Sequence, residues 1–331
     1  MTPEKLLEAM TDLEDYDIMT AKKQTPRRRA GTRKFVVLVA AVVAMMAMTV
    51  TAFAAVSGAA WFKDFFRQET AEQLTQGQLT YIDDNTKDIG QSVTQNGYTM
   101  TLESALSDGY VAYIKLKFEG PEGTVLDADQ YFPTYKKRNF LYATDGRTVS
   151  LVGRWDMMDD GDAQDNAVSI LFTWAGSGFG DDVAWKLELE DIYAVYDRED
   201  GSSEEKMVAE GLWSFDLIFS DLSGEEVEFV SEPFAYHEEV QLSETETYYF
   251  DFQITSLKLR PLSAVIYKRR LDGNVPELFS EMIVVMKDGS TVSMHGHTGS
   301  EEITECILDA PIDLDEVDYI LFPNGTTIPM P

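Results

Sequence analysis

Two histidines, His295 and His297, stand one residue apart in a segment where polar and apolar residues alternate. Residues i and i+2 of a β-strand point to the same face, so the two imidazoles could bind one zinc ion. The candidates for a third ligand are His237, Cys306, Glu301 and Glu302. No complete zinc-ligand spacing is visible, and two surface histidines after a hairpin strand are the alternative that we favour. We therefore expect no bound metal and no cofactor.

Other patterns that resemble binding or catalytic motifs are incomplete. The acidic segment 159–166 carries enough carboxylates for calcium, but it lacks the glycine and the final glutamate of an EF-hand loop. Gly176, Gly178 and Gly180 are followed at once by two aspartates, which would repel a phosphate. No G-x-S-x-G nucleophile motif occurs, and Cys306 is expected to be a small buried hydrophobe. We expect no enzymatic activity.

The composition limits the classes of protein that the chain can represent. Its 331 residues include 58 Asp and Glu against 27 Lys and Arg, which gives a net charge of −31. Hydrophobic residues at 44% and aromatic residues at 11% are typical of a folded protein. A single cysteine excludes an intrachain disulfide framework. The acidity disfavours nucleic acid as a partner, because phosphate groups would be repelled.

The charges divide the chain into four zones. The head up to residue 21 is acidic, residues 22–34 are a basic collar without acids, residues 35–62 carry no charge, and the long body that follows is acidic. A helix of about 20 apolar residues crosses the hydrocarbon core of a bilayer. The sequence therefore predicts a transmembrane helix over residues 35–58, and a buried core helix is the less favoured alternative.

The basic collar predicts the orientation of this span. Positive residues concentrate on the cytoplasmic side of membrane spans, which places the N-terminus in the cytoplasm and the body outside. The residues that set this topology are Lys22, Lys23, Arg27, Arg28, Arg29, Arg33 and Lys34. Trp61, with Phe62, Phe65 and Phe66, is expected at the outer interface as an aromatic belt. We expect a single-pass protein of the cell membrane, in contact with the lipid bilayer.

A cleaved signal peptide is the alternative to a retained anchor. Ala52, Phe53 and Ala54 resemble a signal-peptidase site that follows an apolar segment. The region before that segment would be 34 residues long, which exceeds the usual length and favours an anchor. The body lies outside the membrane under either interpretation.

The head and basic collar, residues 1–34, begin with a short helical pattern. Thr2 can cap a helix and Pro3 suits its first position. Leu6, Met10 and Leu13 recur at i, i+4 and i+7 and form one apolar stripe, with Leu7 beside it. These residues and Ile18 are the candidates for binding a partner. A lone helix of this length is marginal in water, so we expect the stripe to dock into a groove of a cytoplasmic partner. A tail without a fixed structure is the alternative.

The body is expected to be mainly β. After a juxtamembrane helix and connector at residues 59–88, polar and apolar residues alternate, and Asn-Gly or Asp-Gly pairs at 96–97, 145–146 and 288–289 indicate hairpins. Along residues 110–118, the even-numbered residues are expected to be buried and the opposite face to be wet.

The strands predict one or two β-sandwich-like subdomains, at residues 89–200 and 201–331, which fold without metal. The acidic segment 197–205 marks the division, and a long hairpin loop is the alternative there.

The order of these segments resembles a known family. The head contains LLEAMTDLEDYDI, the collar is KKQTPRRRAGTRK, and the span ends in TAFAA. The body opens with QSVTQNGYTMTLESALSDGYVAYIKLKFEGPEGT and closes with PIDLDEVDYILFPNGTTIP. Together these segments resemble the single-span membrane proteins of Gram-positive bacteria that carry an extracytoplasmic domain of unknown function. That family is commonly encoded beside extracytoplasmic-function sigma factors, and its members are regarded as anti-sigma factors.

The resemblance implies a membrane-anchored regulatory protein, an anti-sigma factor whose extracytoplasmic domain is a sensory or binding module without catalytic residues. The head is shorter than a globular anti-sigma domain, so binding of a cytoplasmic sigma factor would depend on its apolar stripe. The alternative function is a membrane-anchored surface-binding or envelope-structural module with no sigma-factor role. A hydrolase or metalloenzyme is the least supported class.

Overall fold

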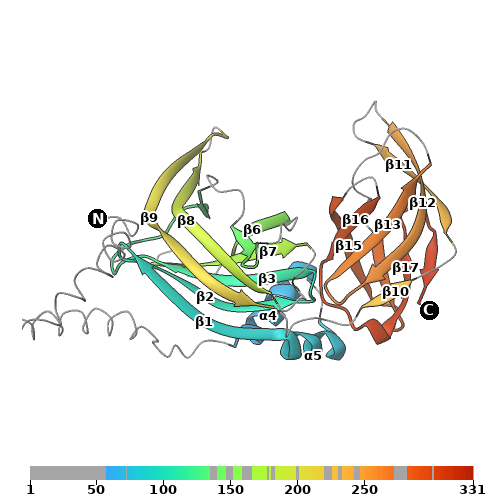
Figure 1. Ribbon diagram of the computed structural model, residues 1–331, viewed down its shortest axis with the longest axis horizontal. Coiled ribbons are helices and arrows are strands. Elements are labelled where there is room, and N and C mark those ends of the chain that lie inside the picture. The colour runs from blue at the N-terminus through green and yellow to red at the C-terminus, as the bar shows by residue number, and fades with distance from the viewer. Residues whose placement is uncertain are drawn as a thin grey trace, which may run out of the picture. The chain divides into compact units, whose positions relative to one another are not determined.

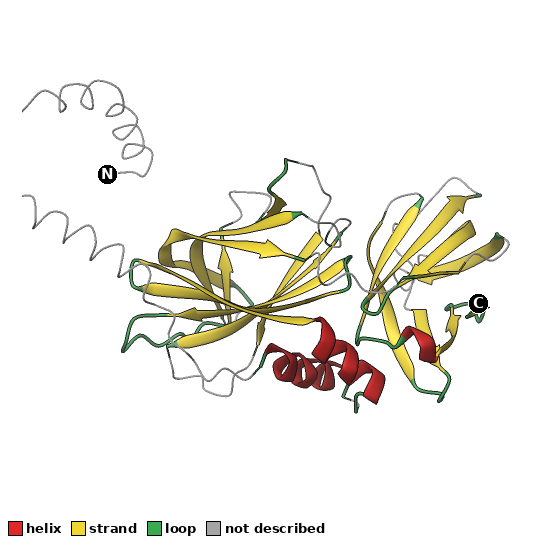
Figure 2. Ribbon diagram, turned by 60° about the horizontal axis from the view of Figure 1, so that its bottom comes forward, coloured by secondary structure: helices red, strands yellow, loops and turns green. Residues whose placement is uncertain are grey.

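The computed structural model describes residues 57–71, 73–134, 140–146, 152–158, 166–176, 179, 183–198, 201–219, 226–229, 233–241, 247–271, 282–299 and 302–330. The predicted head, the basic collar and residues 35–56 of the predicted span lie outside this part of the chain. Within the described residues, no helix is both long and apolar enough to cross a membrane. Residues 52–331 form one compact unit, and the described residues confirm a mainly β fold (Figure 1 and Figure 2).

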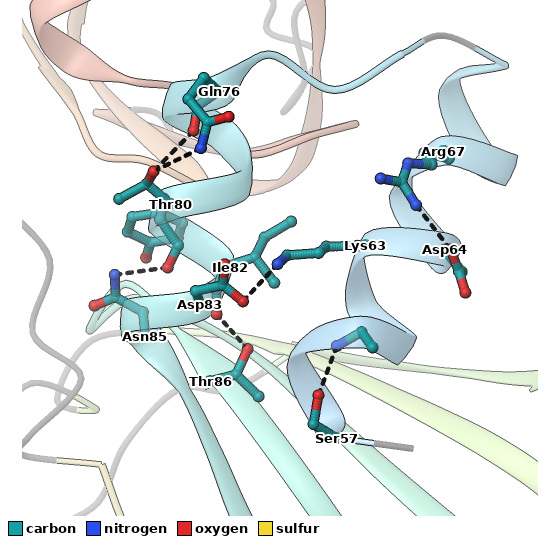
Figure 3. Close-up of polar contacts among 12 residues, drawn as sticks. Ser57, Lys63, Asp64, Arg67, Gln76, Thr80, Ile82, Asp83, Asn85 and Thr86 are labelled. Carbon is teal, nitrogen blue, oxygen red and sulfur yellow. Dashed lines mark hydrogen bonds and ion pairs between the residues drawn. The ribbon is translucent and has the colours of Figure 1, made fainter.

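Helix α4 (Gly58–Thr70) lies where the sequence predicts a juxtamembrane helix. It begins at Ser57, whose hydroxyl group caps the first turn by accepting a backbone hydrogen bond (Figure 3). Phe62 and Phe66 are fully buried in the body. Their assignment to an aromatic belt is therefore wrong, because their apolar area is already covered by protein. Trp61 and Phe65 are half-buried and stack on each other, with ring centres 5.8 Å apart.

A second helix, α5 (Gln76–Asn85), occupies the segment expected to be a connector. Thr75 and Gln78 begin this helix with a capping box, in which each side chain accepts a hydrogen bond from the backbone of the other residue. An ion pair between Lys63 and Asp83 joins α4 to α5 (Figure 3). The Gln78 amide nitrogen donates a 2.7 Å hydrogen bond to the carbonyl of Pro311, so α5 is also attached to the C-terminal part of the body.

The first sheet contains five antiparallel strands in the order β1-β2-β3-β7-β6. They are β1 (Thr86–Gln95), β2 (Tyr98–Ser107), β3 (Val111–Glu119), β6 (Val152–Met158) and β7 (Ala167–Ala175). The β1–β2 hairpin turns at Asn96 and Gly97, whose φ angles are 51° and 87°. These positive angles confirm the hairpin that the Asn-Gly pair predicts.

The second sheet shares a hydrophobic core with the first. It contains β4 (Gln130–Pro133), β5 (Leu141–Ala143), β8 (Ala184–Asp197) and β9 (Ser203–Ile218), with the other three strands each paired to β8. Segment 197–205 connects β8 to β9, so the hairpin alternative is the one that the structure shows. The first core combines residues of both sheets, and its largest buried side chains are Phe118, Tyr131, Phe179, Trp185, Trp213, Phe215 and Phe219.

The third sheet has nine strands and lies in the C-terminal part of the chain. Its order is β10-β12-β13-β16-β15-β14-β17-β18, and β11 also pairs with β12. The strands are β10 (Val227–Phe229), β11 (Phe234–Gln241), β12 (Thr247–Leu259), β13 (Ser263–Arg270), β14 (Met282–Met286), β15 (Thr291–Gly299), β16 (Ile303–Leu308), β17 (Val317–Leu321) and β18 (Thr327–Pro329). A short 3-10 helix, η2 (Leu314–Glu316), precedes β17.

The two Asp-Gly pairs have different outcomes. Gly289 has a φ angle of 87° and closes the β14–β15 hairpin, as predicted. Gly146 also turns the chain, with a φ angle of 80°. The strands on either side of it, however, do not pair with each other, since β5 belongs to the second sheet and β6 to the first. The hairpin predicted at 145–146 is therefore wrong.

Strand β3 contributes to two hydrophobic cores. Its even-numbered residues 112–118 are buried in the first core, as the alternation predicts. Val111 and Tyr113, on the opposite face, are also buried, in a second core with aromatic residues of α4 and residues of the third sheet. The expectation that this face of β3 meets water is wrong at these two positions, because other elements cover it.

Candidate functional site

The histidines considered for zinc do not converge in the described residues. His295 lies on β15 opposite Ile307 of β16, and its Nε2 atom is 3.2 Å from a carboxylate oxygen of Asp309. The register between β15 and β16 shifts between residues 296 and 298, at the position of His297. This irregularity interrupts the alternation on which the pairing of two imidazoles depends. The side chain of His297 lies outside the described part of the structure.

The candidate third ligands are also dispersed. His237 lies on β11 and contacts Asp251 at 2.7 Å, and strands β13 and β16 separate β12 from β15. Cys306 pairs with Gly296, so its side chain faces the opposite side of the sheet from His295. Glu302 is exposed just before β16, and Glu301 lies outside the described residues. Among the described residues, no group of three or more potential metal ligands forms a site.

Cys306 is fully buried, which confirms its interpretation as a small core residue. Burial raises the pKa of its thiol to about 12. A thiol with this pKa is protonated at neutral pH and is a poor nucleophile.

The remaining incomplete motifs lie largely outside the described residues. This applies to the acidic segment 159–165 and to Gly178 and Gly180. Asn166, at the end of that acidic segment, instead fixes a loop by donating a 2.6 Å hydrogen bond to the carbonyl of Gly120. Gly176 donates a backbone hydrogen bond to the carbonyl of Tyr110, which is a structural contact.

A cleft with charged walls is the candidate functional site, and we call it the α4 cleft. It has a volume of about 360 Å³ and is formed by α4, the first sheet and the third sheet. This volume lies within the range of small-molecule sites. Its lining residues are Phe65, Glu69, Tyr113, Arg154, Asp156, Met157, Met158, Thr173, His295, Gly296, Ile307, Leu308 and Asp309.

The floor of the α4 cleft is a row of three residues across the first sheet. Tyr113 of β3 pairs with Thr173 of β7, which in turn pairs with Arg154 of β6. Directly paired residues of antiparallel strands point to the same face, so these side chains lie side by side. Helix α4 contributes Phe65 and Glu69 to the lining, and β15 and β16 contribute further lining residues.

Two ion pairs involve four of the titratable residues that line the cleft. Arg154 Nε lies 2.8 Å from Asp156, and His295 Nε2 lies 3.2 Å from Asp309. Glu69 is exposed and forms no ion pair with any described residue. The lining therefore carries a net negative charge whether His295 is neutral or protonated.

Tyr113 is the most enclosed polar residue of the cleft, with only 4% of its surface exposed. Its ring packs against Phe65 and Phe66, with centres 6.0 and 5.4 Å away. Burial raises the pKa of its hydroxyl group well above the usual value. Charges at Asp108, Asp309 and Glu69 raise this pKa further, whereas Arg154 lowers it. Three of these four charged residues line the cleft, so the hydroxyl group lies within its electrostatic field.

A second hollow, of about 620 Å³, lies beside α5 and η2. Its tyrosine, Tyr81, donates a 3.1 Å hydrogen bond to the carbonyl of Ser107. In contrast, the Tyr113 hydroxyl group forms no hydrogen bond with any residue that the structure describes. The α4 cleft is the better candidate, because it contains an enclosed polar group that is available to a ligand.

The sequence did not point to this cleft. The candidate residues predicted in the head and collar lie outside the described part of the chain, and Trp61 neighbours the cleft without lining it. Of the metal candidates, only His295 belongs to the lining.

Comparison with known proteins relates part of the chain to a family. Residues 27–120 match a family described as a domain of unknown function, DUF4179. The chain is also similar to a conserved domain protein from Bacillus anthracis, whose crystal structure gives a TM-score of 0.44 at 16% identity, over 71% of this chain and 75% of that one. No curated protein matches the sequence. The match covers less than half of the chain and runs from within the basic collar to the end of β3.

Proposed function

We propose that this chain is a single-pass membrane protein and an anti-sigma factor, with a cytoplasmic head that binds a sigma factor and an extracytoplasmic sensory body. The charge pattern supports this topology, because all seven bases of the collar precede an uncharged segment of 28 residues. The acidic β-rich body then lies outside the cell, and residues 35–58 anchor it in the lipid bilayer.

The observation that carries the proposal is the attachment of the body at the end of the predicted span. The amide of Gly58 donates a 2.8 Å hydrogen bond to Asp88, at the start of β1. A Cβ atom on Gly58 would come within 2.4 Å of the Cβ atom of Ser104, so the helix start is packed tightly on β2. Phe62 and Phe66 then fix the first turns of α4 in the second core. A regulator needs such a connection, because displacement of the body is then transmitted to the span.

The family match supports the same interpretation. It spans part of the collar, the predicted span, α4, α5 and the first three strands. A span that served only as an anchor would not need to form a unit with a particular extracytoplasmic hairpin. The alternative remains an anchored surface-binding or envelope-structural module whose head has no partner.

Retention of a sigma factor at the membrane tests the proposal. Membranes from cells that express the full chain with a C-terminal tag are solubilised in mild detergent, and the tagged chain is purified. We expect a sigma factor to co-purify with the full chain and to be lost when residues 1–21 are deleted. A matched chain in which residues 1–21 are replaced by an uncharged Gly-Ser segment controls for length. Absence of any sigma factor from the full-chain sample would favour the surface module instead.

A further inference from the structure

The α4 cleft combines three oxygen acceptors with an apolar and aromatic surface. Glu69 presents a carboxylate that no described residue neutralises. Among the described residues, the carboxylate of Asp309 has one ion-pair partner, His295, at one of its oxygens, which leaves further acceptor capacity. The hydroxyl group of Tyr113 is the third oxygen; the residue is 4% exposed, and this hydroxyl group makes no hydrogen bond with any described residue.

This set of acceptors matches the donors of an ammonium group. A primary ammonium carries three N–H donors and no acceptor, so it requires several surrounding oxygens. The half-buried ring of Phe65 also lies in the lining, and aromatic rings attract cations. An anion is disfavoured, because Asp156 already neutralises Arg154 and the remaining carboxylates repel negative charge.

The rest of the cleft suits an apolar body attached to that cation. Met157, Met158, Ile307 and Leu308 lie in the lining. Methionine side chains adapt to ligands of irregular shape, and burial of apolar area favours binding. A volume of about 360 Å³ accommodates a molecule somewhat larger than a single aromatic amine.

We propose that the α4 cleft binds a small organic ammonium ion with an apolar or aromatic body, and that Glu69, Asp309 and Tyr113 coordinate its cationic group. Because Phe65 and Glu69 belong to α4, an occupied cleft contacts the helix that follows the predicted span. In the regulator proposed above, this ligand would be the extracytoplasmic signal. That role rests on the proposed function, whereas binding of the ligand does not.

Titration with phenethylammonium chloride tests the site. The full chain is kept in detergent micelles, and binding is followed by saturation-transfer NMR of the probe. We expect saturable binding that is at least about tenfold tighter than that of 2-phenylethanol, the neutral analogue. Binding of 3-phenylpropionate, the anionic analogue, should be weaker still.

Substitutions in the cleft distinguish binding of the probe at this site from its partition into detergent micelles. Glu69→Gln and Asp309→Asn should each weaken binding by about threefold, and the double variant by about tenfold. Tyr113→Phe should weaken it by about threefold while leaving the ring contacts intact. Glu122→Gln, at an exposed position outside the cleft, is the matched control and should leave binding unchanged.

The proposal is overturned if phenethylammonium does not saturate, if the neutral alcohol binds as tightly, or if the double variant binds normally. Preferential binding of 3-phenylpropionate would identify an anion site and would also overturn it. The assay contains no cytoplasmic protein, so its failure leaves the sigma-factor proposal intact. Conversely, loss of sigma-factor retention leaves the ammonium site intact.

Discussion

The buried carboxylate of Asp108 accepts a 2.6 Å hydrogen bond from the hydroxyl group of Ser263, which lies 155 residues further along the chain. The same oxygen accepts a 3.1 Å hydrogen bond from the amide of Leu262. The other carboxylate oxygen accepts bonds from the amides of Tyr110 and Val111, at 2.9 and 2.7 Å. One side chain thus fixes the β2–β3 turn to the turn between β12 and β13. Both turns adjoin the second core, so this contact stabilises the part of the body on which α4 packs.

Asp108→Asn should lower the free energy of unfolding by about 2–4 kcal/mol. The substituted amide presents N–H donors where four donors require an acceptor, which leaves buried donors unpaired. Urea unfolding of residues 57–331, followed by tryptophan fluorescence, measures the change. Asp127→Asn, at an exposed position, is the matched control and should alter the stability by less than about 0.5 kcal/mol. Equal stability of the two variants would contradict this role of Asp108.

The boundaries of the folding unit give the second prediction. Residues 57–331 should melt cooperatively, whereas residues 86–331 should melt at a clearly lower temperature. The shorter fragment lacks Phe62, Phe66 and Ile82, all fully buried in the second core. Loss of one buried phenylalanine side chain costs about 3–5 kcal/mol. Circular dichroism at increasing temperature compares the two fragments.

The same melts test the absence of a structural metal. EDTA should leave the melting temperature of residues 57–331 unchanged, since metal that binds the native state would raise it. A large decrease with the chelator would restore the zinc site at His295 and His297. Equal melting of the two fragments would show that α4 and α5 add nothing to the core.

Strand alternation and turn chemistry were predictable from the sequence because both are local. Residues 187 and 189, and 213–219 in alternation, are buried as their period of two predicts. Asn96-Gly97 and Asp288-Gly289 close hairpins because positive φ angles require such residues.

Other features depended on contacts that the sequence does not display. Helix α5 contains few apolar residues, and its capping box at Thr75 and Gln78 was the one local signal of a helix start. Val111 and Tyr113 occupy the side of β3 that carries Lys115 and Lys117 further on. Alternation therefore indicated a wet face, although α4 and the third sheet bury its first half.

The α4 cleft was hidden for the same reason. Glu69, Tyr113 and Asp309 belong to three distant segments, and no spacing connects them. They meet because α4 packs on the outer face of the first sheet, next to β15 and β16. The aromatic residues Phe62 and Phe66 follow the predicted span, so the sequence suggested a membrane interface. They pack instead in the second core, against residues of the third sheet that lie far along the chain.

The thiol of Cys306 provides a third prediction. Because burial raises its pKa to about 12, the native protein should not react with Ellman's reagent at pH 8, whereas the protein unfolded in urea should release one equivalent of product. Between pH 9 and 12 the unfolded thiol ionises and the native thiol does not, so the free energy of unfolding should fall as the pH rises. Rapid labelling of the native protein would contradict the buried position.

The pH effect has a matched control. Cys306→Ala removes the titrating group, and its stability should therefore decrease less steeply above pH 9 than that of the parent chain. Buried tyrosines with raised pKa values, such as Tyr113, add to the decrease in both proteins at still higher pH. Identical slopes for the variant and the parent would show that the thiol does not contribute.

The predicted topology is open to a protease test. Proteinase K added to intact protoplasts should remove the body and spare a tag at the N-terminus, because the basic collar directs the head to the cytoplasm. Lysis of the protoplasts should expose the tag to digestion, which confirms that the protease can cleave it. Loss of the tag from intact protoplasts, with survival of the body, would reverse the orientation.

The head gives the last prediction. If the stripe of Leu6, Met10 and Leu13 docks into a groove on a sigma factor, Leu6→Asp or Leu13→Asp should weaken binding at least about tenfold. Burial of a leucine side chain contributes about 1.5–3 kcal/mol, and a charge in an apolar groove adds a desolvation cost. Glu8→Ala, on the opposite side of the expected helix from Leu6, Met10 and Leu13, is the control and should weaken binding by less than about threefold.

Fluorescence anisotropy of labelled residues 1–34 with purified sigma factors of the cell measures these affinities. Binding that ignores both leucine variants would exclude a helix in a groove. Binding to none of the sigma factors would leave the head as a topogenic tail, and the body would then be best explained as an anchored surface module.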